Sequence, residues 1–283
     1  MPVTETGVAD RMNKSDWSVE EVQRFRKEVY AQRKLRQALE TWLSDAGRSA
    51  DKAALGMAQW ILGNLKEGCE TLKSPGKNPA AAYVAGRCFL AAGKAEEAAR
   101  ILKDAGGESS EAPEVQILYA EALVESGDLK GAQAALKKIQ SRNDQRGEFH
   151  YIFGRLHERN REHEAMLESY EKAAQFDPEN ARAVFRMAAY YDLFGEDAKA
   201  LELYERCASM NPTHVNALLN LGVIYEDNGD QDRAIECYKR VLKVHPNHER
   251  AILFLKDAIA STTMYYDEEL RKLDKVNPDA IPG

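Results

Sequence analysis

The amino-acid sequence repeats itself with a 34-residue period, and this period constrains the fold more than any other feature. Pro178, Pro212 and Pro246 follow one another at this interval, and tyrosines, alanines and glycines recur in the same frame. The recurring residues are Tyr170, Tyr204 and Tyr238; Tyr191 and Tyr225; Ala98 and Ala132; Ala200 and Ala234; and Gly93, Gly127, Gly195 and Gly229, with Arg161 where a fifth glycine would stand. Such a period is typical of stacked repeat arrays, in which each unit buries its apolar side against its neighbours.

Each recurring residue has a physical role in a unit built from two helices. Glycine between two helical patterns adopts the left-handed conformation that ends a helix, which is cheap only without a Cβ. Proline closes the unit because it cannot continue the second helix. The alanines let neighbouring helices approach, and tyrosines and leucines three and four residues apart form the apolar stripe. With nine prolines and eighteen glycines in 283 residues, the composition also suits a mostly helical chain.

The clearest unit resembles the tetratricopeptide repeat (TPR). Its residues are Leu218-x-x-Leu221-Gly222-x-x-Tyr225, then Ala234-x-x-x-Tyr238 and Pro246, with Leu218 in place of the usual first aromatic. The resemblance implies an all-α fold, a right-handed TPR superhelix (an α-solenoid of antiparallel helix pairs) with a capping helix at each end. It covers five consecutive units, residues 79–112, 113–146, 147–180, 181–214 and 215–248.

The residues before these five units are expected to form an N-terminal cap. Residues 47–78 match a degenerate, shortened repeat, and residues 17–46 are predicted to form one capping helix. Ser18 and Glu21 have the spacing of a capping box at its start. Residues 1–16 carry little that could pack, so we expect them to be disordered. The predicted buried side of the capping helix is Val22, Phe25, Val29, Leu35, Leu39 and Trp42.

The C-terminal end is expected to be a second cap. We expect Asn247 to start a helix over residues 249–275, with residues 276–283 as a tail or linker. A terminal helix with a polar outer face keeps such an array soluble. The predicted buried residues of this helix are Ile252, Leu255, Ile259, Tyr266, Leu270 and Leu273.

A second resemblance concerns this C-terminal end. Residues 260–269, together with Ile281 and Pro282, resemble the junction in certain bacterial TPR proteins whose repeats lead into a further module. That module is similar to the C-terminal domain of the alpha chain of RNA polymerase. It is absent here, so the chain is shortened or the likeness is fortuitous. A genuine likeness implies an adaptor close to the transcription machinery.

Composition excludes several classes of function. A formal net charge of −7 argues against general binding of phosphate backbones. The sequence has no apolar stretch of the roughly twenty residues that cross a membrane, and its start lacks a signal-peptide core. We therefore predict a cytoplasmic protein. Its cysteines have neither metal-type nor redox-type spacing and are expected to be buried, reduced thiols: Cys69, Cys88, Cys207 and Cys237.

No chemistry is predicted for the chain. The sequence has no Ser/His/Asp set, no Gly-rich phosphate loop and no His-Glu-x-x-His motif. His245 and His248 flank one turn, and His157 and His163 flank another, but two histidines alone rarely bind a metal. His150 and His157 fit packing positions of their repeat. We therefore predict neither enzymatic activity, nor a catalytic residue, nor a metal, nor any other cofactor.

The resemblance to TPR proteins places the first helix of every unit on a concave groove. Alternating apolar and Arg or Asn positions suit an extended peptide, because Asn can bond its main chain and Arg can bind carboxylates. The predicted peptide-binding residues are Tyr151, Arg155, Arg159, Arg182, Phe185, Arg186, Asn216, Asn220 and Arg250. Further groove positions are Tyr83, Val84, Arg87, Ile117, Leu118, Glu121, Glu148, Ile152, Leu219, Val223 and Phe254.

Two arginine pairs decide which partner is expected. Arg155 and Arg159, like Arg182 and Arg186, lie one helical turn apart and share a face. They bind acidic side chains of a protein partner, or they form a solvated face partnered by acidic residues of the chain; both interpretations stay open. The acidic residues in question are Glu148, Glu158 and Asp192. The groove lacks the Lys/Asn/Asn/Lys/Arg set of TPR co-chaperones, so a chaperone tail is not expected.

A basic run precedes the repeats, and it too has two interpretations. It could touch nucleic acid or an acidic partner, but a solvated helix face is favoured. Its cations are Arg24, Arg26, Lys27, Arg33, Lys34 and Arg36.

The predicted function is that of a non-catalytic scaffold or adaptor that binds a peptide or protein segment in the groove. The partner is expected to be a protein or peptide with acidic side chains; neither a membrane nor, in the main, nucleic acid is expected. The alternative is a structural or assembly component that docks a folded partner, or itself, through its caps or convex face.

Overall fold

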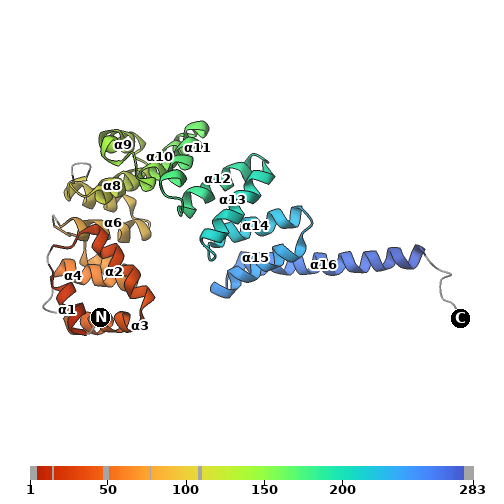
Figure 1. Ribbon diagram of the computed structural model, residues 1–283, viewed down its shortest axis with the longest axis horizontal. Helices are drawn as coiled ribbons and strands as arrows, with labels where there is room; N and C mark the ends of the chain where they lie inside the picture. The colour runs from red at the N-terminus through yellow and green to blue at the C-terminus, as the bar shows by residue number, and fades with distance from the viewer. Residues whose placement is uncertain (1–4, 15, 47–50, 77, 108–109, 277–283) are drawn as a thin grey trace. The chain divides into compact units, whose positions relative to one another are not determined.

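The computed structural model describes residues 5–14, 16–46, 51–76, 78–107 and 110–276, with residues 263–276 as helix backbone alone. These ranges contain sixteen α-helices and no β-strand, which confirms the all-α fold (Figure 1). None of the described helices combines the length and hydropathy that would let it span a membrane. The chain divides into two compact units, Met1–Phe176 (unit 1) and Asp177–Gly283 (unit 2), and each is described by itself.

Unit 1 begins with three helices, α1 (Glu5–Met12), α2 (Val19–Ala31) and α3 (Arg33–Ala46). The predicted disorder of residues 1–16 is therefore wrong for α1. Val8 and Met12 are 0% and 1% exposed, because their spacing of four residues places both on one side of the helix. Helix α1 packs on α3.

The predicted single helix over residues 17–46 is also corrected, because its path breaks at Gln32. Gln32 adopts an extended conformation, with φ −126° and ψ 104°, and separates α2 from α3. The predicted capping box is present, since Glu21 N donates to Ser18 Oγ over 3.1 Å and Ser18 N donates to Glu21 Oε2 over 2.8 Å. Of the residues predicted to be buried, Trp42 is half-buried and the others are buried.

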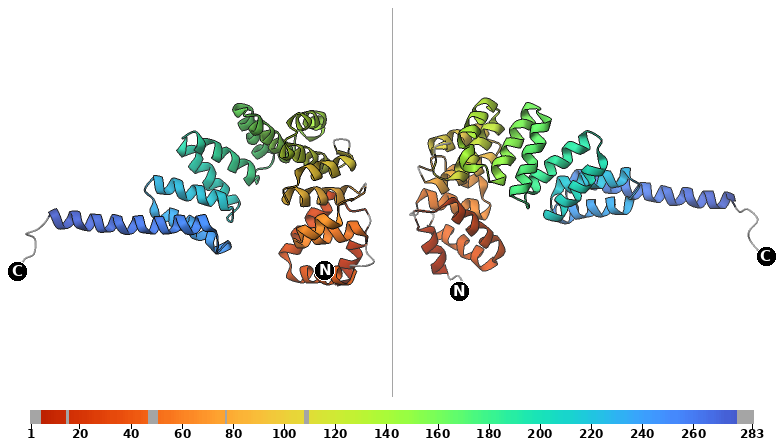
Figure 2. Two further views of the ribbon diagram at one scale, coloured as in Figure 1. Left: turned by 180° about the vertical axis from the view of Figure 1, so that it is seen from behind. Right: turned by 45° about the horizontal axis from the view of Figure 1, so that its top comes forward.

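The rest of unit 1 consists of antiparallel helix pairs (Figure 2). A short pair, α4 (Lys52–Leu62) and α5 (Leu65–Thr71), precedes three longer ones. The longer pairs are α6 (Pro79–Ala91) with α7 (Ala95–Asp104), α8 (Pro113–Ser126) with α9 (Leu129–Asn143), and α10 (Gly147–Asn160) with α11 (His163–Phe176). The first helices lie side by side, with α4 against α6, α6 against α8 and α8 against α10.

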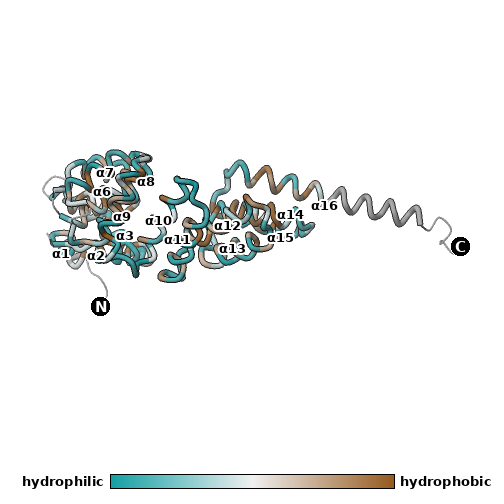
Figure 3. The backbone as a smooth tube through the Cα atoms, turned by 90° about the horizontal axis from the view of Figure 1, so that it is seen from above, coloured by the Kyte–Doolittle hydropathy of each residue, from teal (hydrophilic) through white to brown (hydrophobic). Residues whose placement is uncertain are grey.

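Unit 2 contains two helix pairs and one long helix. The pairs are α12 (Ala181–Leu193) with α13 (Asp197–Met210) and α14 (Val215–Asp227) with α15 (Gln231–Val244). Helix α16 (Glu249–Val276) packs on α15 and runs past its end in Figures 1 and 2. Hydrophobic and hydrophilic residues alternate along its described side chains (Figure 3).

The start and the buried side of α16 differ from the prediction. His248, not Asn247, caps the helix, because its Nδ1 accepts a hydrogen bond from Ala251 N over 3.2 Å. Ala251 and Ala258 are buried, whereas Ile259 is 47% exposed. Ile252 and Leu255 are half-buried. The predicted buried residues Tyr266, Leu270 and Leu273 lie outside the described side chains.

The tyrosines of the repeat frame hold each helix pair together. Tyr170 and Tyr204 are fully buried, and each donates a hydrogen bond to an acidic residue of its own pair. The acceptors are Glu158 Oε2, at 2.9 Å, and Asp192 Oδ2, at 3.0 Å. Both carboxylates were expected to partner the groove arginines, and each also accepts a hydrogen bond from a tyrosine hydroxyl of its own helix pair.

Glycine is required at two kinds of position, where two helices pack most closely and where a helix ends. A Cβ on Gly154 would lie 2.4 Å from Tyr170 Cε1, so the first helix can pack on this ring only without one. The glycines between paired helices have positive φ, as expected. At the equivalent turn between α10 and α11, Arg161 has φ 62°, and it is the one non-glycine residue in the left-handed region within the described ranges.

Candidate protein-binding surface

The first helices of unit 1 carry a row of charges that neutralise one another. Arg87, Glu121 and Arg155 occupy the same position of three successive repeats, on α6, α8 and α10. Arg87 Nη1 lies 3.1 Å from Glu121 Oε2, and Arg87 Nη2 lies 3.8 Å from Glu148 Oε1. Arg155 Nη2 lies 2.7 Å from Glu125 Oε1. Cation and carboxylate thus join α6 to α8 and α8 to α10.

Arg155 is held too firmly to serve as a freely available cation. Its side chain is 16% exposed, and its Nε lies 3.2 Å from Glu158 Oε2 in addition to the contact with Glu125. Burial opposes its charge, but the neighbouring Tyr151 and Glu125 outweigh burial and raise the pKa of Arg155 above its usual value. Tyr151 itself is 3% exposed and packs on the ring of Tyr170. Tyr151 and Arg155, both predicted to bind peptide, therefore form the floor of this surface.

Arg159 is the more accessible member of its pair. Its side chain is 46% exposed, and its Nη2 lies 4.0 Å from Glu125 Oε2. The pairs Arg155–Arg159 and Arg182–Arg186 belong to different units, so a joint cluster of the four stays a prediction.

In unit 2 some predicted residues also have packing roles. Phe185 is half-buried between the rings of Tyr204 and His214, with centroid separations of 5.8 and 4.7 Å. Asn220 Nδ2 donates to Tyr204 Oη over 2.7 Å, which extends the hydrogen bond from Tyr204 to Asp192. Phe185 and Asn220 therefore connect one repeat to the next.

Three other residues form what we call the donor row of unit 2: Arg182, Asn216 and Arg250. They occupy the same first-turn position of α12, α14 and α16, each one repeat period after the last. Arg182 is half-buried, and Asn216 and Arg250 are exposed. The Arg250 guanidinium lies 5.4 Å from the centre of the Phe254 ring. Arg186, one turn after Arg182, is half-buried. Equivalent residues of stacked repeats share a face, so the donor row presents guanidinium and amide N–H groups along one side of unit 2.

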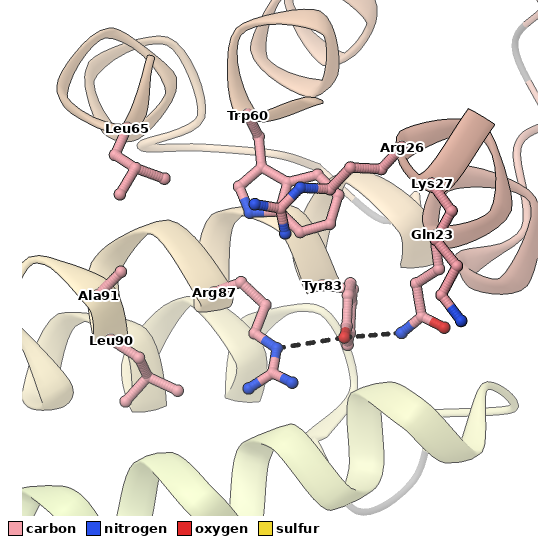
Figure 4. Close-up of a pocket in the computed structure, with 9 residues that line it drawn as sticks. All are labelled: Gln23, Arg26, Lys27, Trp60, Leu65, Tyr83, Arg87, Leu90 and Ala91. Atoms are coloured by element: carbon pink, nitrogen blue, oxygen red, sulfur yellow. Dashed lines mark hydrogen bonds between the residues drawn. The ribbon is translucent and has the colours of Figure 1, made fainter. Parts of the chain in front are cut away.

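The structure also contains a pocket that the sequence did not predict (Figure 4). It has a volume of about 470 Å³ and lies in unit 1 between α2, α4, α5 and α6. Arg26 and Lys27, predicted to lie on a solvated helix face, line it together with Tyr83 and Arg87. The signal in the sequence was the position of Arg26, four residues after Val22 and three before Val29, which are both buried. That spacing places Arg26 at the edge of the buried side of α2.

Models of the tetratricopeptide repeat match residues 89–152, 147–180 and 215–248. This chain is a tetratricopeptide repeat protein. Two of the matches span the same residues as units of the 34-residue frame. Such repeats are typically non-catalytic modules for protein interaction, so this TPR protein is best described as an interaction scaffold.

Solved structures of two tetratricopeptide repeat proteins and of one further complex share the fold of this chain. A tetratricopeptide repeat protein from Parabacteroides merdae is 15% identical, with a TM-score of 0.61 over 84% of this chain and 98% of its own. A TPR protein of Thermus thermophilus is 18% identical, with a TM-score of 0.53 over 64% of this chain and 99% of its own. The Cut9–Hcn1 structure of the APC/C is 11% identical, with a TM-score of 0.61 over 90% of this chain and 52% of the matched chain. No curated protein matches the sequence.

Proposed function

We propose that this TPR protein binds an extended, acidic segment of a partner protein along the first helices of its repeats. The donor row of unit 2 carries the proposal. Arg182, Asn216 and Arg250 offer N–H donors at one position of three successive helices, and two of the three side chains are exposed. Guanidinium groups bind carboxylates, and an Asn amide can bond the main chain of an extended segment.

The other predicted residues have supporting roles in this proposal. Arg186 lies one turn along α12 from Arg182 and adds a second cation to that helix, and Arg159 is the more accessible arginine of its pair in unit 1. Tyr151, Arg155, Phe185 and Asn220 hold the helices that present these cations.

The decisive experiment identifies the partner and then removes the donors. A pull-down from the native cell with mass spectrometry supplies the partner. The variant Arg182→Ala plus Arg250→Ala is then expected to bind it roughly tenfold more weakly, because each exposed ion pair contributes up to about 1 kcal/mol. Affinity is also expected to fall with added salt.

The matched control is Arg206→Ala plus Lys239→Ala, which removes the same charge from exposed positions on the second helices α13 and α15. It should bind like the parent. If the donor-row variant also binds like the parent, the segment does not dock on this face.

One observation favours a second function, in which copies of the chain associate through the C-terminal cap. Leu253 and Ile259 of α16 are 54% and 47% exposed and offer apolar surface for such a contact. Sedimentation that finds a monomer at high protein concentration would rule this function out. A link with the transcription machinery stays a prediction from the resemblance of residues 260–269.

A further inference from the structure

The pocket of unit 1 combines an aromatic floor with cations on two sides. Trp60 comes from α4, and Arg26 and Lys27 come from α2; Tyr83 and Arg87 come from α6 (Figure 4). All these elements belong to unit 1. The pocket therefore unites the basic run, the degenerate repeat and the first complete repeat.

The aromatic floor fixes the direction of the Arg26 guanidinium. Its carbon lies 4.1 Å from the centre of the Trp60 ring, and the ring of Tyr83 meets Trp60 edge-on at 83°. A guanidinium stacked on indole keeps its N–H groups in the plane, where they are available to a bidentate acceptor. Tyr83 Oη is occupied by donors, at 2.7 Å from Gln23 Nε2 and 3.1 Å from Arg87 Nε.

Two of the three cations that line this pocket have no carboxylate beside them in the described part of the chain. Among the described residues, no carboxylate lies within 4.0 Å of Arg26 or Lys27, whereas Arg36 of the same basic run pairs with Glu40 at 3.0 Å. Arg87 has Glu121 and Glu148 as partners. Two uncompensated cations in a chain of net charge −7 form a local inversion of sign that attracts an anion selectively.

The remaining wall is apolar. Leu65, Leu90 and Ala91 line it, and Leu65 is 36% exposed. A ligand that used only the cations would leave this wall in contact with water. The lining thus fits a ligand that has an anionic group and, beside it, a large apolar group.

We propose that this pocket binds an acidic side chain of a protein partner together with the large apolar side chain adjacent to it in the partner's sequence. The proposal deepens the proposed function, on which it rests, by stating the chemistry of the partner segment at unit 1. Protein is favoured over nucleic acid because the cations converge on one concave site with an apolar wall and do not form a track along a backbone.

Nuclear magnetic resonance of the isotope-labelled full chain tests the proposal without the native partner. The chain has three tryptophans, so three indole N–H signals are expected, and Trp60→Phe identifies the one that belongs to the pocket. The probe is a capped hexapeptide, Gly-Ser-Asp-Leu-Ser-Gly. Its two matched peptides replace Asp by Asn or Leu by Ser.

The Asp-Leu peptide is expected to shift the Trp60 signal in a saturable manner, and each matched peptide should bind at least fivefold more weakly. Arg26→Gln plus Lys27→Gln should weaken binding at least tenfold. Lys27→Gln alone, at an exposed residue that leaves the Arg26–Trp60 stack intact, should weaken it about threefold. Arg33→Gln plus Lys34→Gln removes two exposed charges of the same run outside the pocket and should leave binding unchanged.

The proposal is overturned if the Trp60 signal does not move at millimolar peptide, or if the Asn peptide binds as well as the Asp peptide. It is also overturned if the Arg33 and Lys34 control loses as much affinity as the pocket variant, which would indicate general charge attraction. A shift caused by a thymidine oligonucleotide but by none of the peptides would assign the pocket to nucleic acid. None of these variants alters unit 2. A negative result for the pocket therefore does not contradict the proposal for the donor row, and a negative result with the donor-row variant does not contradict the proposal for the pocket.

Discussion

The two units use arginines of their first helices in different ways. In unit 1 Arg155 lies 2.7 Å from Glu125, a residue of the preceding repeat, and its side chain is 16% exposed. In unit 2 Arg250 is exposed and packs on a ring of its own helix. These two arginines stand at different positions of the repeat. They also differ in their surroundings, because the preceding repeat places a carboxylate, Glu125, beside Arg155.

The residues at the repeat position of Glu125 differ in charge between the two units. Its equivalents in the following repeats are Arg159, Leu193 and Asp227. Only Glu125 and Asp227 are acidic, and Leu193 is 79% exposed. Unit 1 therefore uses charge at this position to join two of its first helices, whereas unit 2 exposes an apolar side chain, Leu193, at the first equivalent position.

The largest expected effect is aggregation of the chain after its C-terminal helix, which belongs to unit 2, is removed. Deletion of residues 249–283 removes Ala251, Ala258 and Phe254 and exposes Tyr238, whose ring lies 5.5 Å from that of Phe254. A repeat array without its terminal cap exposes an apolar face. We expect aggregation in light scattering while circular dichroism keeps most of the helix signal.

The control for this deletion is a chain that ends after residue 262, which keeps all described side-chain contacts of α16. It should stay monomeric. If the chain lacking residues 249–283 also stays monomeric at high concentration, α16 is not a cap.

The second prediction tests the charge network of unit 1. Glu125→Gln removes one of the two carboxylates beside the half-buried Arg155 guanidinium, and the loss of a hydrogen bond to such a charged group costs roughly 1–3 kcal/mol. Asp227→Asn changes the equivalent, exposed residue of unit 2 and should cost less than about 0.5 kcal/mol. Urea unfolding of the two variants gives the comparison. Equal losses would mean that the ion pairs of unit 1 add nothing to its stability.

The parts of the fold that the sequence predicted are those encoded by local spacing. The 34-residue period places glycine, alanine and tyrosine where helix turns and helix contacts need them, and the helix pairs follow. Two features had no such local signal. Helix α1 rests on only two buried apolar residues, Val8 and Met12. The break at Gln32 occurs without a glycine or proline.

The candidate site was harder to predict because its partners are distant in sequence. Glu125 precedes Arg155 by nearly one repeat length, and Arg26 precedes Trp60 by a whole one. Position within a repeat identifies which residues share a helix face. It does not reveal a carboxylate supplied by the neighbouring repeat or an aromatic ring supplied by a degenerate one.

The third prediction uses the turn at Arg161, where unit 1 departs from the glycine found at the equivalent turn of unit 2. A residue with a Cβ in the left-handed region costs roughly 1 kcal/mol or more. Arg161→Gly should therefore raise the urea midpoint of unfolding, and Gly195→Arg, with φ 72° in unit 2, should lower it. Shifts in the same direction would show that strain in the left-handed backbone does not determine the effect.

The smallest expected effect is a dependence of the stability of unit 2 on pH. It comes from the cap of one helix, and the cap at the equivalent helix start of unit 1 does not share it. Helix α6 is capped by Asn78, whose Oδ1 accepts from Ala81 N over 3.0 Å at any pH. Helix α14 is capped instead by His214, whose Nδ1 accepts from Ala217 N over 3.1 Å and can do so only when that nitrogen is unprotonated. Burial, in part against the Phe185 ring, lowers the pKa of His214 below its usual value.

The unfolded chain thus binds a proton at this histidine more readily than the folded chain does. The contribution of the cap is complete above the ordinary histidine pKa of about 6.5 and is lost as the pH falls through the lower pKa of the folded state. Because an N-cap is worth about 1 kcal/mol, the melting temperature should fall slightly more between pH 7.5 and 5 in the parent than in His214→Asn, which keeps the cap at every pH. His245→Asn changes an exposed ring and should follow the parent. If His214→Asn loses as much stability in acid as the parent, the pH dependence of unit 2 has its origin in other groups.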